Sequence, residues 1–379
     1  MALQFQRNAD VYVEVMDAAR TSVLTTWKVP VLEGFSFTQS INSSEITINE
    51  AGTTSRRARL LFNDSLAPAE WSFSTYIRPV VATNVLAPEQ VLWAMMFGAN
   101  SFSTNVYSND TFSPAVPVNT LTGSTENEFN LDASNISAMP DNWNIVFAFE
   151  DGTNKQYFRM NKAVVNSVSV DFDIEGIATA SWSGFSVDIQ DLGTAGPTES
   201  PTFVANLASA ITTGTTGTDN FIRNRISTVS LSRTDTSPDD TYNIVLTGGS
   251  ISIENNINYL TPSELANVNV PLANITGARS ISGSLTCYFD NDQANSKSGE
   301  LFADLVADTS TVRNVFDMAI NIGGESTGTP RIAFDLPTAH LEVPTINVED
   351  LLTLEVAFHG QVANGDVDST NEATIIYKA

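Results

Sequence analysis

The sequence contains very few of the residues on which thiol and metal chemistry depend. Among its 379 residues there are one cysteine, Cys287, and two histidines, His340 and His359. A single cysteine excludes an internal disulfide framework, and two histidines cannot supply a His-rich metal site. We therefore expect a protein with no metal and no cofactor.

Positive charge is also scarce. The chain has 18 Lys and Arg against 43 Asp and Glu, which gives a formal net charge of −25. A surface with this excess of carboxylates repels polyanions. General nucleic-acid binding and attachment to an anionic membrane surface are therefore not expected.

Long apolar runs are missing too. Residues Met1–Asp10 include Arg7 and hold no apolar segment of signal-peptide length. No later window approaches the ~18 continuous apolar residues of a membrane-spanning helix. We expect no membrane insertion, and a protein made and kept in the cytoplasm unless a larger assembly carries it out. With 42% hydrophobic residues, the chain can form two or three domains with proper cores.

The sequence is rich in polar and apolar residues that alternate with a period of two, among them many Val, Ile, Thr and aromatics. This pattern is typical of half-buried strands and predicts a mainly β protein. One helix is expected in each half: Val91–Phe97, with Glu89 at its amino end, and Glu300–Ala307, capped by Ser298. The clearest predicted strands are Val11–Val15, Gly34–Ile41, Trp71–Arg78, Asn144–Glu150, Val164–Ile174 and Thr179–Ile189.

Gly, Pro and Thr dominate the stretch Leu192–Asn220. This composition predicts an interdomain linker, within which the short apolar piece Phe203–Ile211 should dock on one domain. The predicted organisation is a first domain over residues 1–192, a linker over 193–220 and a second domain over 221–379.

The two halves resemble each other in order along the chain, which favours a duplication over chance. The separation between matched residues falls towards the end, so about 33 extra residues of the first half lie within Ala99–Asn142. The matched groups are Ser36, Phe37, Ile41 and Asn42 with Ser252, Ile253, Ile257 and Asn258; Ser72, Phe73 and Tyr76 with Ser284, Leu285 and Tyr288; Leu92, Trp93 and Ala94 with Leu301, Phe302 and Ala303; and Trp182, Ser183 and Gly184 with Phe358, His359 and Gly360.

Two adjoining segments carry a family resemblance. They are VPVLEGFSFTQSINSSEITINEAG, residues 29–52, and SRRARLLFNDSLAPAEWSFSTYIRP, residues 55–79. A strand with Gly34, Phe35 and Phe37 leads into a Ser-Glu-Ile loop, a basic run and a WSFSTY strand. This combination resembles the major tail tube proteins of long-tailed bacteriophages, and the close match covers about the first 100 residues.

The resemblance implies a β-barrel or sandwich flanked by a helix, similar in fold to the type VI secretion tube protein, which forms stacked six-fold rings around a channel. Two tandem units in one chain depart from the single-unit pattern. In duplicated family members three chains build a ring with pseudo-six-fold symmetry, so a trimer is expected. The second unit is expected to run to Ala379, leaving no decoration domain.

The resemblance also implies partners and a location. The expected partners are further copies of the chain, a tape measure protein inside the tube, and tail-tip and terminator proteins at its ends. Phage DNA is expected to pass through the tube without specific binding. The implied location is the virion tail, after assembly in the bacterial host cytoplasm.

One predicted strand has a dry face and an acidic face, because residues of a strand alternate between its two sides. An ordinary solvated face is one interpretation. The other is that the acidic face lines the channel, where carboxylates repel the DNA backbone. The acidic face consists of Ser167, Ser169, Asp171, Asp173 and Glu175, and the dry face of Val168, Val170, Phe172 and Ile174; Glu254, Glu349, Thr345 and Asn347 are the candidates in the second half.

The run SRRAR, with Arg56, Arg57 and Arg59, is the one concentrated positive charge in the sequence. A DNA-binding patch fits poorly with the net charge, and a solvated loop is the plain alternative. We favour a contact with an acidic neighbouring subunit, because the loop Asn42–Ala69 is long for a hairpin and guanidinium groups suit charged interfaces. In the proteins it resembles, this loop reaches adjacent subunits or the next ring.

Enzyme motifs fail on specific grounds. A calcium loop starting at Asp290 would place Asn295 where glycine is needed and Leu301 where glutamate is needed. Asp171 and Asp173 share one strand face and lack the pocket of a glycosidase pair. His359 is expected at a surface or interface, and the tryptophans in the core. We expect a self-assembling structural protein; the alternatives are a tandem β-sandwich that binds carbohydrate or acts as an adhesin, with aromatics at loop tips, and thirdly an enzyme with paired carboxylates.

Overall fold

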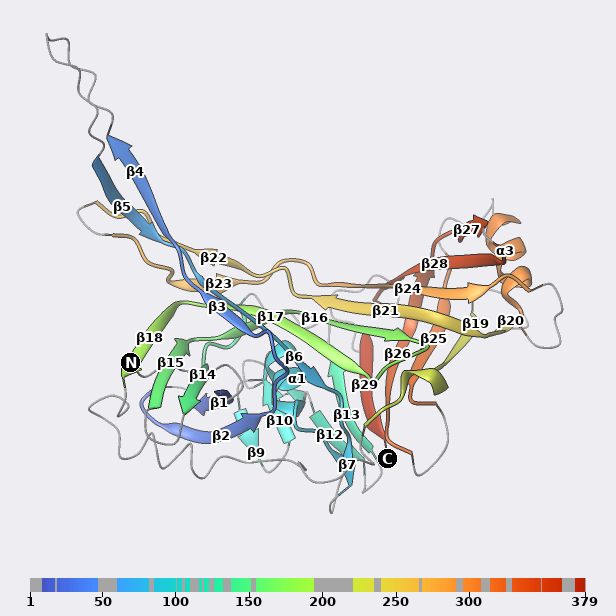
Figure 1. Ribbon diagram of the computed structural model, residues 1–379, viewed down its shortest axis with the longest axis horizontal. Helices are drawn as coiled ribbons and strands as arrows, with labels where there is room; N and C mark the ends of the chain where they lie inside the picture. The colour runs from blue at the N-terminus through green and yellow to red at the C-terminus, as the bar shows by residue number, and fades with distance from the viewer. Residues whose placement is uncertain are drawn as a thin grey trace, which may run out of the picture.

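Over the residues that it describes, the computed structural model is mainly β with two short α-helices, as the sequence predicts (Figure 1). None of the helices in the described ranges is long and apolar enough to cross a membrane. The structure describes residues 9–17, 19–46, 60–81, 85–99, 101–103, 106–109, 116–117, 119–122, 126–131, 138–150, 155–193, 221–234, 240–265, 268–290, 296–307, 314–324, 329–348, 350–362 and 372–378.

The elements of the first half are β1 (Ala9–Met16), β2 (Val23–Val29), β3 (Ser36–Thr38), β4 (Ile41–Ile46), β5 (Leu60–Leu66), β6 (Ala69–Tyr76), β7 (Val80–Val81), β8 (Val85–Leu86), α1 (Gln90–Met96), β9 (Ser101–Ser103), β10 (Val106–Asn109), β11 (Val116–Pro117), β12 (Asn119–Thr122), β13 (Glu126–Leu131), β14 (Trp143–Glu150), β15 (Lys155–Asn161), β16 (Val164–Asp173), β17 (Thr179–Ser186) and β18 (Asp188–Gly193). Those of the second half are η2 (Asn224–Ile226), β19 (Thr228–Arg233), β20 (Asp240–Ile244), β21 (Leu246–Glu254), β22 (Asn258–Leu260), β23 (Ala273–Ile275), β24 (Ser280–Tyr288), α3 (Ser298–Ala307), β25 (Phe316–Ile322), β26 (Arg331–Leu341), β27 (Thr345–Val348), β28 (Leu352–Gly360) and β29 (Ala373–Lys378).

Period-two alternation explains why these segments form strands with one buried face. In β6, Ala69, Trp71 and Phe73 are at most 3% exposed, whereas Glu70 between them is exposed. Side chains of a strand point alternately to its two faces, so the apolar set is buried together. All five tryptophans of the chain are at most 2% exposed, which confirms their predicted place in the core.

One long sheet joins the two halves. Its centre has the order β3-β6-β17-β16-β21-β24-β28-β27, with the first four strands from the first half and the last four from the second. A separate five-stranded sheet, β18-β15-β14-β1-β2, belongs to the first half. Neither sheet closes on itself over the described residues, so the expected β-barrel is not formed by the single chain. In a single chain the sheet therefore ends in open edges.

The outer strands of the two halves follow the same order. In the first half it is β2-β1-β14-β15-β18, and in the second half β20-β19-β25-β26-β29. One expected match needs a correction. Ser72 pairs with Ser36 and Ser183, and the residue that pairs with Ser252 and His359 is Ser282. The residue equivalent to Ser72 in the second half is therefore Ser282 and not Ser284, which lies two positions later. The pairing of all the strands together sets this equivalence.

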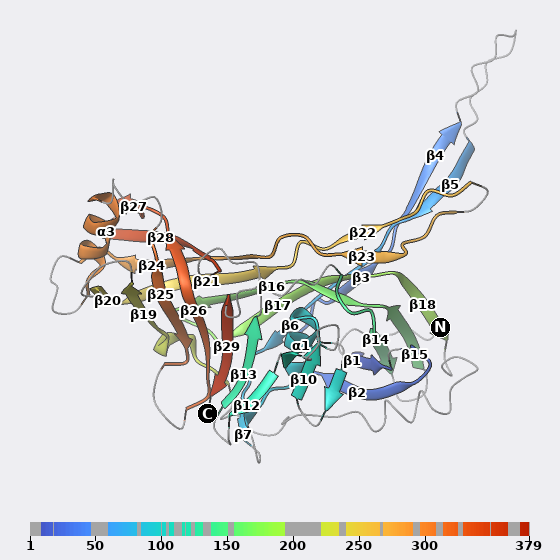
Figure 2. The same cartoon turned by 180° about the vertical axis from the view of Figure 1, so that it is seen from behind.

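The two halves meet along two strand pairs, β16 with β21 and β13 with β29, which we call the seam. Helix α1 packs against β16 on the buried side of the long sheet, and one hydrophobic cluster continues through both halves (Figures 1 and 2). At the seam Asn255 donates to the carbonyl oxygens of Met96 at 3.0 Å and Val165 at 3.2 Å. Arg279 donates to Asn255 and pairs with Glu372, both at 3.1 Å. Asn255 is thus bonded across the seam and is held in place by Arg279 of its own half.

Two predicted strands are each divided in the structure. The segment 34–41 ends at Thr38, because the side chain of Gln39 bonds to the backbone of Ala67, Val187 and Ile189 and turns the chain outward. The segment 179–189 ends at Ser186, and Ile189 belongs to β18.

The helix ends also differ from the sequence prediction. Ser298 is the first residue of α3, and its hydroxyl bonds to Tyr288 and Asp290 rather than capping the helix. Glu89 precedes α1 but makes no capping hydrogen bond. The linker residues after Gly193, including Phe203–Ile211, lie outside the described residues.

Candidate functional site: the polar face of the long sheet

The side of the long sheet away from the core is covered by small hydroxyl side chains. Strand pairing aligns them in rows that cross both halves. We call this surface the polar face. One row is Ser74, Ser181, Ser169, Ser252, Ser282 and His359; a second is Ser36, Ser72, Ser183, Ser167, Glu254 and Ser280; a third is Tyr76, Thr179, Asp171, Ser250, Ser284 and Ala357; and a fourth is Asp173, Gly248, Thr286, Glu355 and Thr345.

The serines of the polar face bond to one another across the strands. Ser167 and Ser183 lie 2.7 Å apart, Ser36 and Ser72 2.9 Å, and Ser74 and Ser181 3.1 Å, each measured between hydroxyl oxygens. Such cross-strand hydroxyl pairs are modest stabilisers of a sheet. These three pairs lie between β3, β6, β17 and β16, so this part of the face is polar but uncharged.

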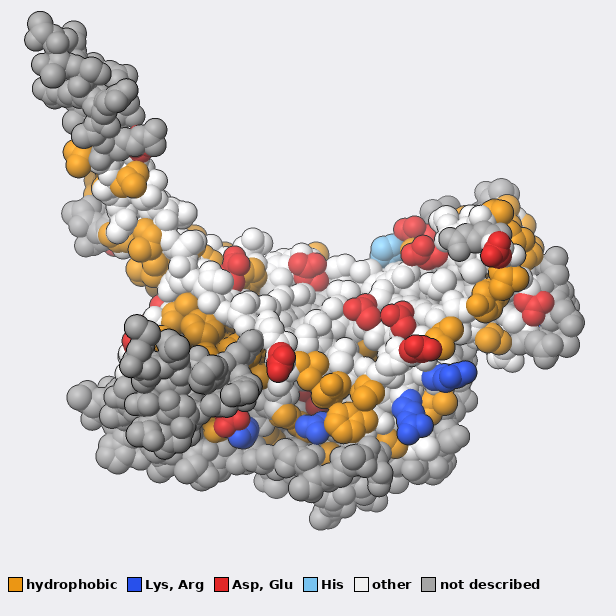
Figure 3. Space-filling model, viewed as in Figure 1, with side chains coloured by type: hydrophobic (Ala, Val, Ile, Leu, Met, Phe, Trp, Pro, Cys, Tyr) orange, Lys and Arg blue, Asp and Glu red, His pale blue; other side chains and the backbone are white. Residues whose placement is uncertain are grey.

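The charges on the polar face are of one sign. Exposed carboxylates stand on four of its strands: Glu70 on β6, Asp171 and Asp173 on β16, Glu254 on β21 and Glu355 on β28. Within the rows given above no Lys or Arg occurs. Figure 3 shows acidic side chains along the upper part of the body and Lys and Arg below them. The face therefore repels polyanions and offers no cation to a phosphate.

The structure brings most of the predicted acidic residues together. Asp171, Asp173 and Glu254 share the polar face, and Val168, Val170 and Phe172 opposite them are at most 2% exposed. The strand ends at Asp173, so Glu175 lies in the bend that follows, and Ile174 is 43% exposed instead of buried.

For the other predicted residues the structure does not test the predicted role. Thr345 and Asn347 are exposed on β27, whereas Glu349 lies outside the described residues. Arg56, Arg57 and Arg59 also lie outside them. Their contact with a neighbouring subunit stays a prediction.

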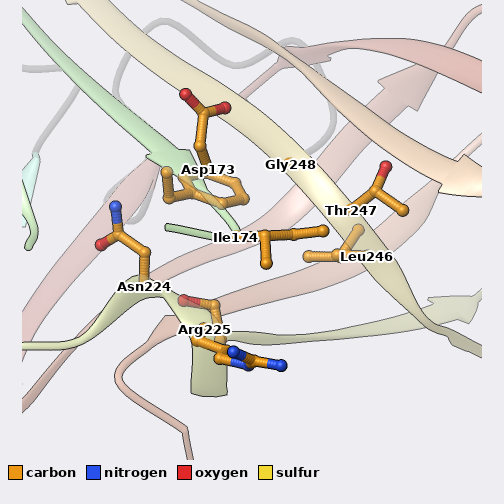
Figure 4. Close-up of a pocket in the computed structure, with 9 residues that line it drawn as sticks. Asp173, Ile174, Asn224, Arg225, Leu246, Thr247 and Gly248 are labelled. Carbon is orange, nitrogen blue, oxygen red and sulfur yellow. The ribbon is translucent and has the colours of Figure 1, made fainter. Parts of the chain in front are cut away.

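A small pocket opens at one end of the β16–β21 pairing (Figure 4). Asp173, Asn224, Arg225 and Gly248 are among its lining residues, and the side chains of Asp173 and Arg225 point in opposite directions. An ideal Cβ on Gly248 would lie 3.2 Å from the Asp173 carboxylate. The pocket holds no ion pair between these two side chains, and the groups around it do not form a catalytic pair. In the described parts of the chain no cluster of three His, Cys, Asp or Glu could hold a metal ion.

The two histidines of the sequence are cross-strand neighbours, which sequence reasoning missed. His340 on β26 pairs directly with His359 on β28, and His359 Nε2 lies 3.0 Å from a carboxylate oxygen of Glu342. His359 is 46% exposed, as expected for a surface residue. The Nδ1 atom of His340 is buried and has no hydrogen-bond partner among the described residues. A buried ring nitrogen without a partner is costly in a folded protein.

A carboxyl group is buried behind the polar face, at the amino end of α1. One oxygen of Glu89 accepts a hydrogen bond from the Tyr377 hydroxyl at 2.8 Å and one from the Arg78 N–H at 3.2 Å. Trp93 donates to the same hydroxyl at 2.6 Å. The second Glu89 oxygen has no partner among the residues described. Burial is the main cause that raises the Glu89 pKa from 4.5 to about 7, and the Tyr377 and Arg78 contacts oppose it.

Two hairpins project from the sheet in the same direction (Figure 1). The first arm is β4 with β5, and the second arm is residues 257–276 with β22 and β23. They touch each other at Asn269, which donates to Asp64 O at 3.1 Å and accepts from Leu66 N–H at 2.7 Å. Exposed apolar side chains gather on both; they are Ile41, Leu60, Leu61 and Phe62 on the first arm and Leu260, Leu265, Val268, Val270, Leu272 and Ile275 on the second.

Comparison with known proteins assigns this architecture to a class. Residues 79–360 match the phage tail tube protein family, and the chain belongs to that family. It is a structural component of the virion tail and not an enzyme. Among individual proteins it is similar to the tail tube protein pb6 of Escherichia phage T5. The two are 30% identical over 381 residues, which cover 98% of this chain and 75% of that protein. The resemblance detected in residues 29–79 is confirmed.

Proposed function

We propose that three copies of this chain close into a ring and that the rings stack into the hollow tube through which phage DNA passes. Each chain supplies two units, residues 1–192 and 221–379, joined by the linker 193–220. A ring of three chains then contains six units in pseudo-six-fold symmetry. The tape measure protein would occupy the tube before DNA, and tail-tip and terminator proteins would close its ends.

The observation that carries the proposal is the strand order of the long sheet. The set β3-β6-β17-β16 is followed directly by β21-β24-β28-β27, and β16 of the first set pairs with β21 of the second. In this repeat β21 is the first strand of its set, as β3 is of the other. Likewise β27 is the last strand of its set, as β16 is of the other. A further copy could therefore continue the sheet by pairing its β3 with β27.

The two ends of this repeat are suited to such a pairing. β3 pairs only with β6 and β27 only with β28 in the part of the chain that the structure describes. Both are short, and the side chains of β27 are all exposed. Open strand edges invite pairing with another chain, and closure of a ring removes them. Ring closure thus satisfies the backbone groups that a single chain leaves unpaired.

In such a ring the polar face would line the channel. Its serine rows and the carboxylates Asp171, Asp173, Glu254 and Glu355 would surround the passing duplex, with Glu349 as a further candidate. Carboxylates repel phosphates, and serine hydroxyls carry no charge to hold them. DNA would slide through without a stable contact.

The assembly is tested by electron microscopy and mass photometry of the purified protein. We expect rings or tubes with three chains per ring. Six chains per ring would mean that one half builds the wall and the other decorates it.

The same assay tests the contact expected of Arg56, Arg57 and Arg59, because a variant with all three changed to Ser should stay folded but polymerise poorly.

The lining is tested by reversing its charge. Changing Asp171 and Asp173 to Lys should leave assembly intact, because the buried residues opposite them are unaltered. Each new cation can contact a phosphate, so genome delivery should slow severalfold at low salt and recover partly as salt is raised. Delivery at the unaltered rate at every salt concentration would mean that this face is only solvated. Changing both residues to Asn is the control for loss of negative charge alone.

A further inference from the structure

The five-stranded sheet of the first half has apolar side chains on both of its faces. On β1, Val11 and Val13 face the main core, so Tyr12 between them points to the opposite side, which we call the outer face. A separate hydrophobic cluster lies there, on the adjacent strands β1, β14, β15 and β18 (Figures 1 and 2). Its members are Tyr12, Val146, Ala148, Tyr157 and Leu192.

The outer face is shielded from water. The five side chains of the cluster are at most 8% exposed. Glu14, on the same side of β1 as Tyr12, is fully buried, and one of its carboxyl oxygens lies 3.2 Å from Arg159 Nε. Over the described residues, however, these strands pair only within their own sheet, and no further apolar side chain packs on the cluster. An apolar sheet face needs a covering layer, and the described residues do not supply it.

The second half has corresponding strands without such a cluster. Across β19, β25, β26 and β29 the side chains opposite the core form the row Ser230, Ala319, Asp335 and Thr374. Ser230 is exposed and the other three are half-buried. A mixed polar surface of this kind is stable in contact with water. The first half therefore needs a cover that the second half does not.

The segment that follows β18 has an amphipathic sequence. Leu192 is the last residue but one of β18 and a member of the cluster, so the chain leaves the sheet beside the outer face. Residues 194–220 lie outside the described ones. Within them apolar residues recur at the spacing of one side of an α-helix. They are Phe203, Val204, Leu207, Ala208 and Ile211.

The start and the length of such a helix fit the sheet. Ser200 is a favourable N-cap, and Pro201 is tolerated at the first helical position. A helix over residues 201–211 would be ~16 Å long at a rise of about 1.5 Å per residue. The four strands that carry the cluster are three spacings of ~4.8 Å, or ~14 Å, across. A helix this short is marginal alone in water, so it depends on packing.

We propose that residues 201–211 form an amphipathic helix that docks on the outer face, with the apolar stripe on the cluster around Tyr12 and Tyr157. The occupant is this segment of the same chain, because the segment begins where the cluster ends, at Leu192. Residues 194–200 can span up to about 24 Å, which is enough to cross the sheet. The linker is then anchored to the first half, and only residues 212–220 pass to the second half. This docking goes beyond the ring, because it holds in a single chain.

A thiol placed in the outer face reports on the cover. Ala148 is fully buried in the cluster, so Ala148→Cys should react with a maleimide at least about 100-fold more slowly than a free thiol. The native Cys287 should not react, because it is buried and burial raises its thiol pKa to about 11. Labelling is measured by mass spectrometry on the full-length monomer.

Two charged variants test which segment forms the cover. Val204→Asp with Leu207→Asp places two carboxylates in the apolar stripe, and in this background the introduced thiol should react at least about tenfold faster. Asn206→Asp with Ser209→Asp adds the same charge on the opposite side of the helix. This matched control should leave the labelling rate within about twofold. Tryptophan fluorescence, from five buried side chains, checks that each variant is folded.

Each other outcome would overturn the docking. In one such outcome the Val204→Asp, Leu207→Asp protein is folded and its introduced thiol stays unreactive. If deletion of residues 1–8 exposes the thiol instead, the amino-terminal segment is the cover. If dilution of the otherwise unaltered chain exposes it, a second copy is the cover. None of these results bears on ring formation, so the proposed function would stand.

Hydrogen exchange tests the helix without any substitution. In the monomer the amides of residues 203–211 should exchange at least about tenfold more slowly than those of residues 212–220, because docking protects a helix from local opening. Equal exchange over both stretches would show that the segment does not dock. This measurement decides the question even if the charged variant fails to fold.

Discussion

Gly249→Ala should lower the free energy of unfolding by about 3 kcal/mol, because the backbone at this place has no room for a methyl group. An ideal Cβ on Gly249 would lie 2.6 Å from Phe172 Cζ and 2.7 Å from Ser284 O. Phe172 is the cross-strand partner of Gly249 and is buried, so its ring cannot move aside freely. Urea denaturation of the monomer, followed by tryptophan fluorescence, measures the loss.

The adjacent residue supplies a matched control. A Cβ on Gly248 would point to the other face of β21 and meet the Asp173 carboxylate at 3.2 Å, a flexible and exposed group. Gly248→Ala should therefore cost less than about 1 kcal/mol. If both variants unfold at the same urea concentration, the ring of Phe172 does not fix the packing at the seam.

Glu89→Gln should make the protein more stable at pH 8 and flatten the dependence of its stability on pH. The Glu89 pKa is raised from 4.5 to about 7 by burial, so the folded state favours the protonated carboxyl. This contribution is fully present below pH 4.5 and is lost as pH rises to 7, which amounts to about 3 kcal/mol. A neutral Gln avoids that loss. Denaturation midpoints from pH 4 to pH 8 measure the difference.

Burial sets the sign of this effect, against the groups that face Glu89. Tyr377 and the backbone and charge of Arg78 favour the ionised form, but burial outweighs them. Glu355→Gln removes an exposed carboxylate of the polar face and should keep the pH dependence, because Glu89 is still present. A Glu89→Gln variant with the same pH dependence as the unaltered protein would mean that Glu89 is already ionised in the fold.

Much of the fold could be predicted because strands show in the sequence as polar and apolar residues that alternate with a period of two. Alternation predicts β1, β6, β14 and β16 within two residues of their ends, and both helices lie within two residues of their predicted bounds, although neither Glu89 nor Ser298 caps its helix. The serine rows could also have been found in advance, since serine recurs at every second position in β6, β17, β21 and β24. Taken within one strand, this signal predicts alternation alone, because the rows form only through the register of neighbouring strands.

The rest depends on contacts between residues far apart in the sequence. No local pattern reports that β16 pairs with β21, or that β13 reaches β29 in the other half. The pairing of His340 with His359 and the burial of Glu89 beneath Tyr377 follow from those crossings. The break at Gln39 was missed because its cause is a side-chain bond to β18 and not a breaker residue.

The unequal lengths of the two arms would mark every second position around the proposed ring. The hairpin enclosed by Asn42 and Ser65 is six residues longer than that enclosed by Asn258 and Ile275. A ring of identical single units would present six equal projections at its rim. Three chains of this kind would present long and short projections in alternation. A protein at the end of the tube could then recognise three-fold positions, while the channel wall keeps pseudo-six-fold symmetry.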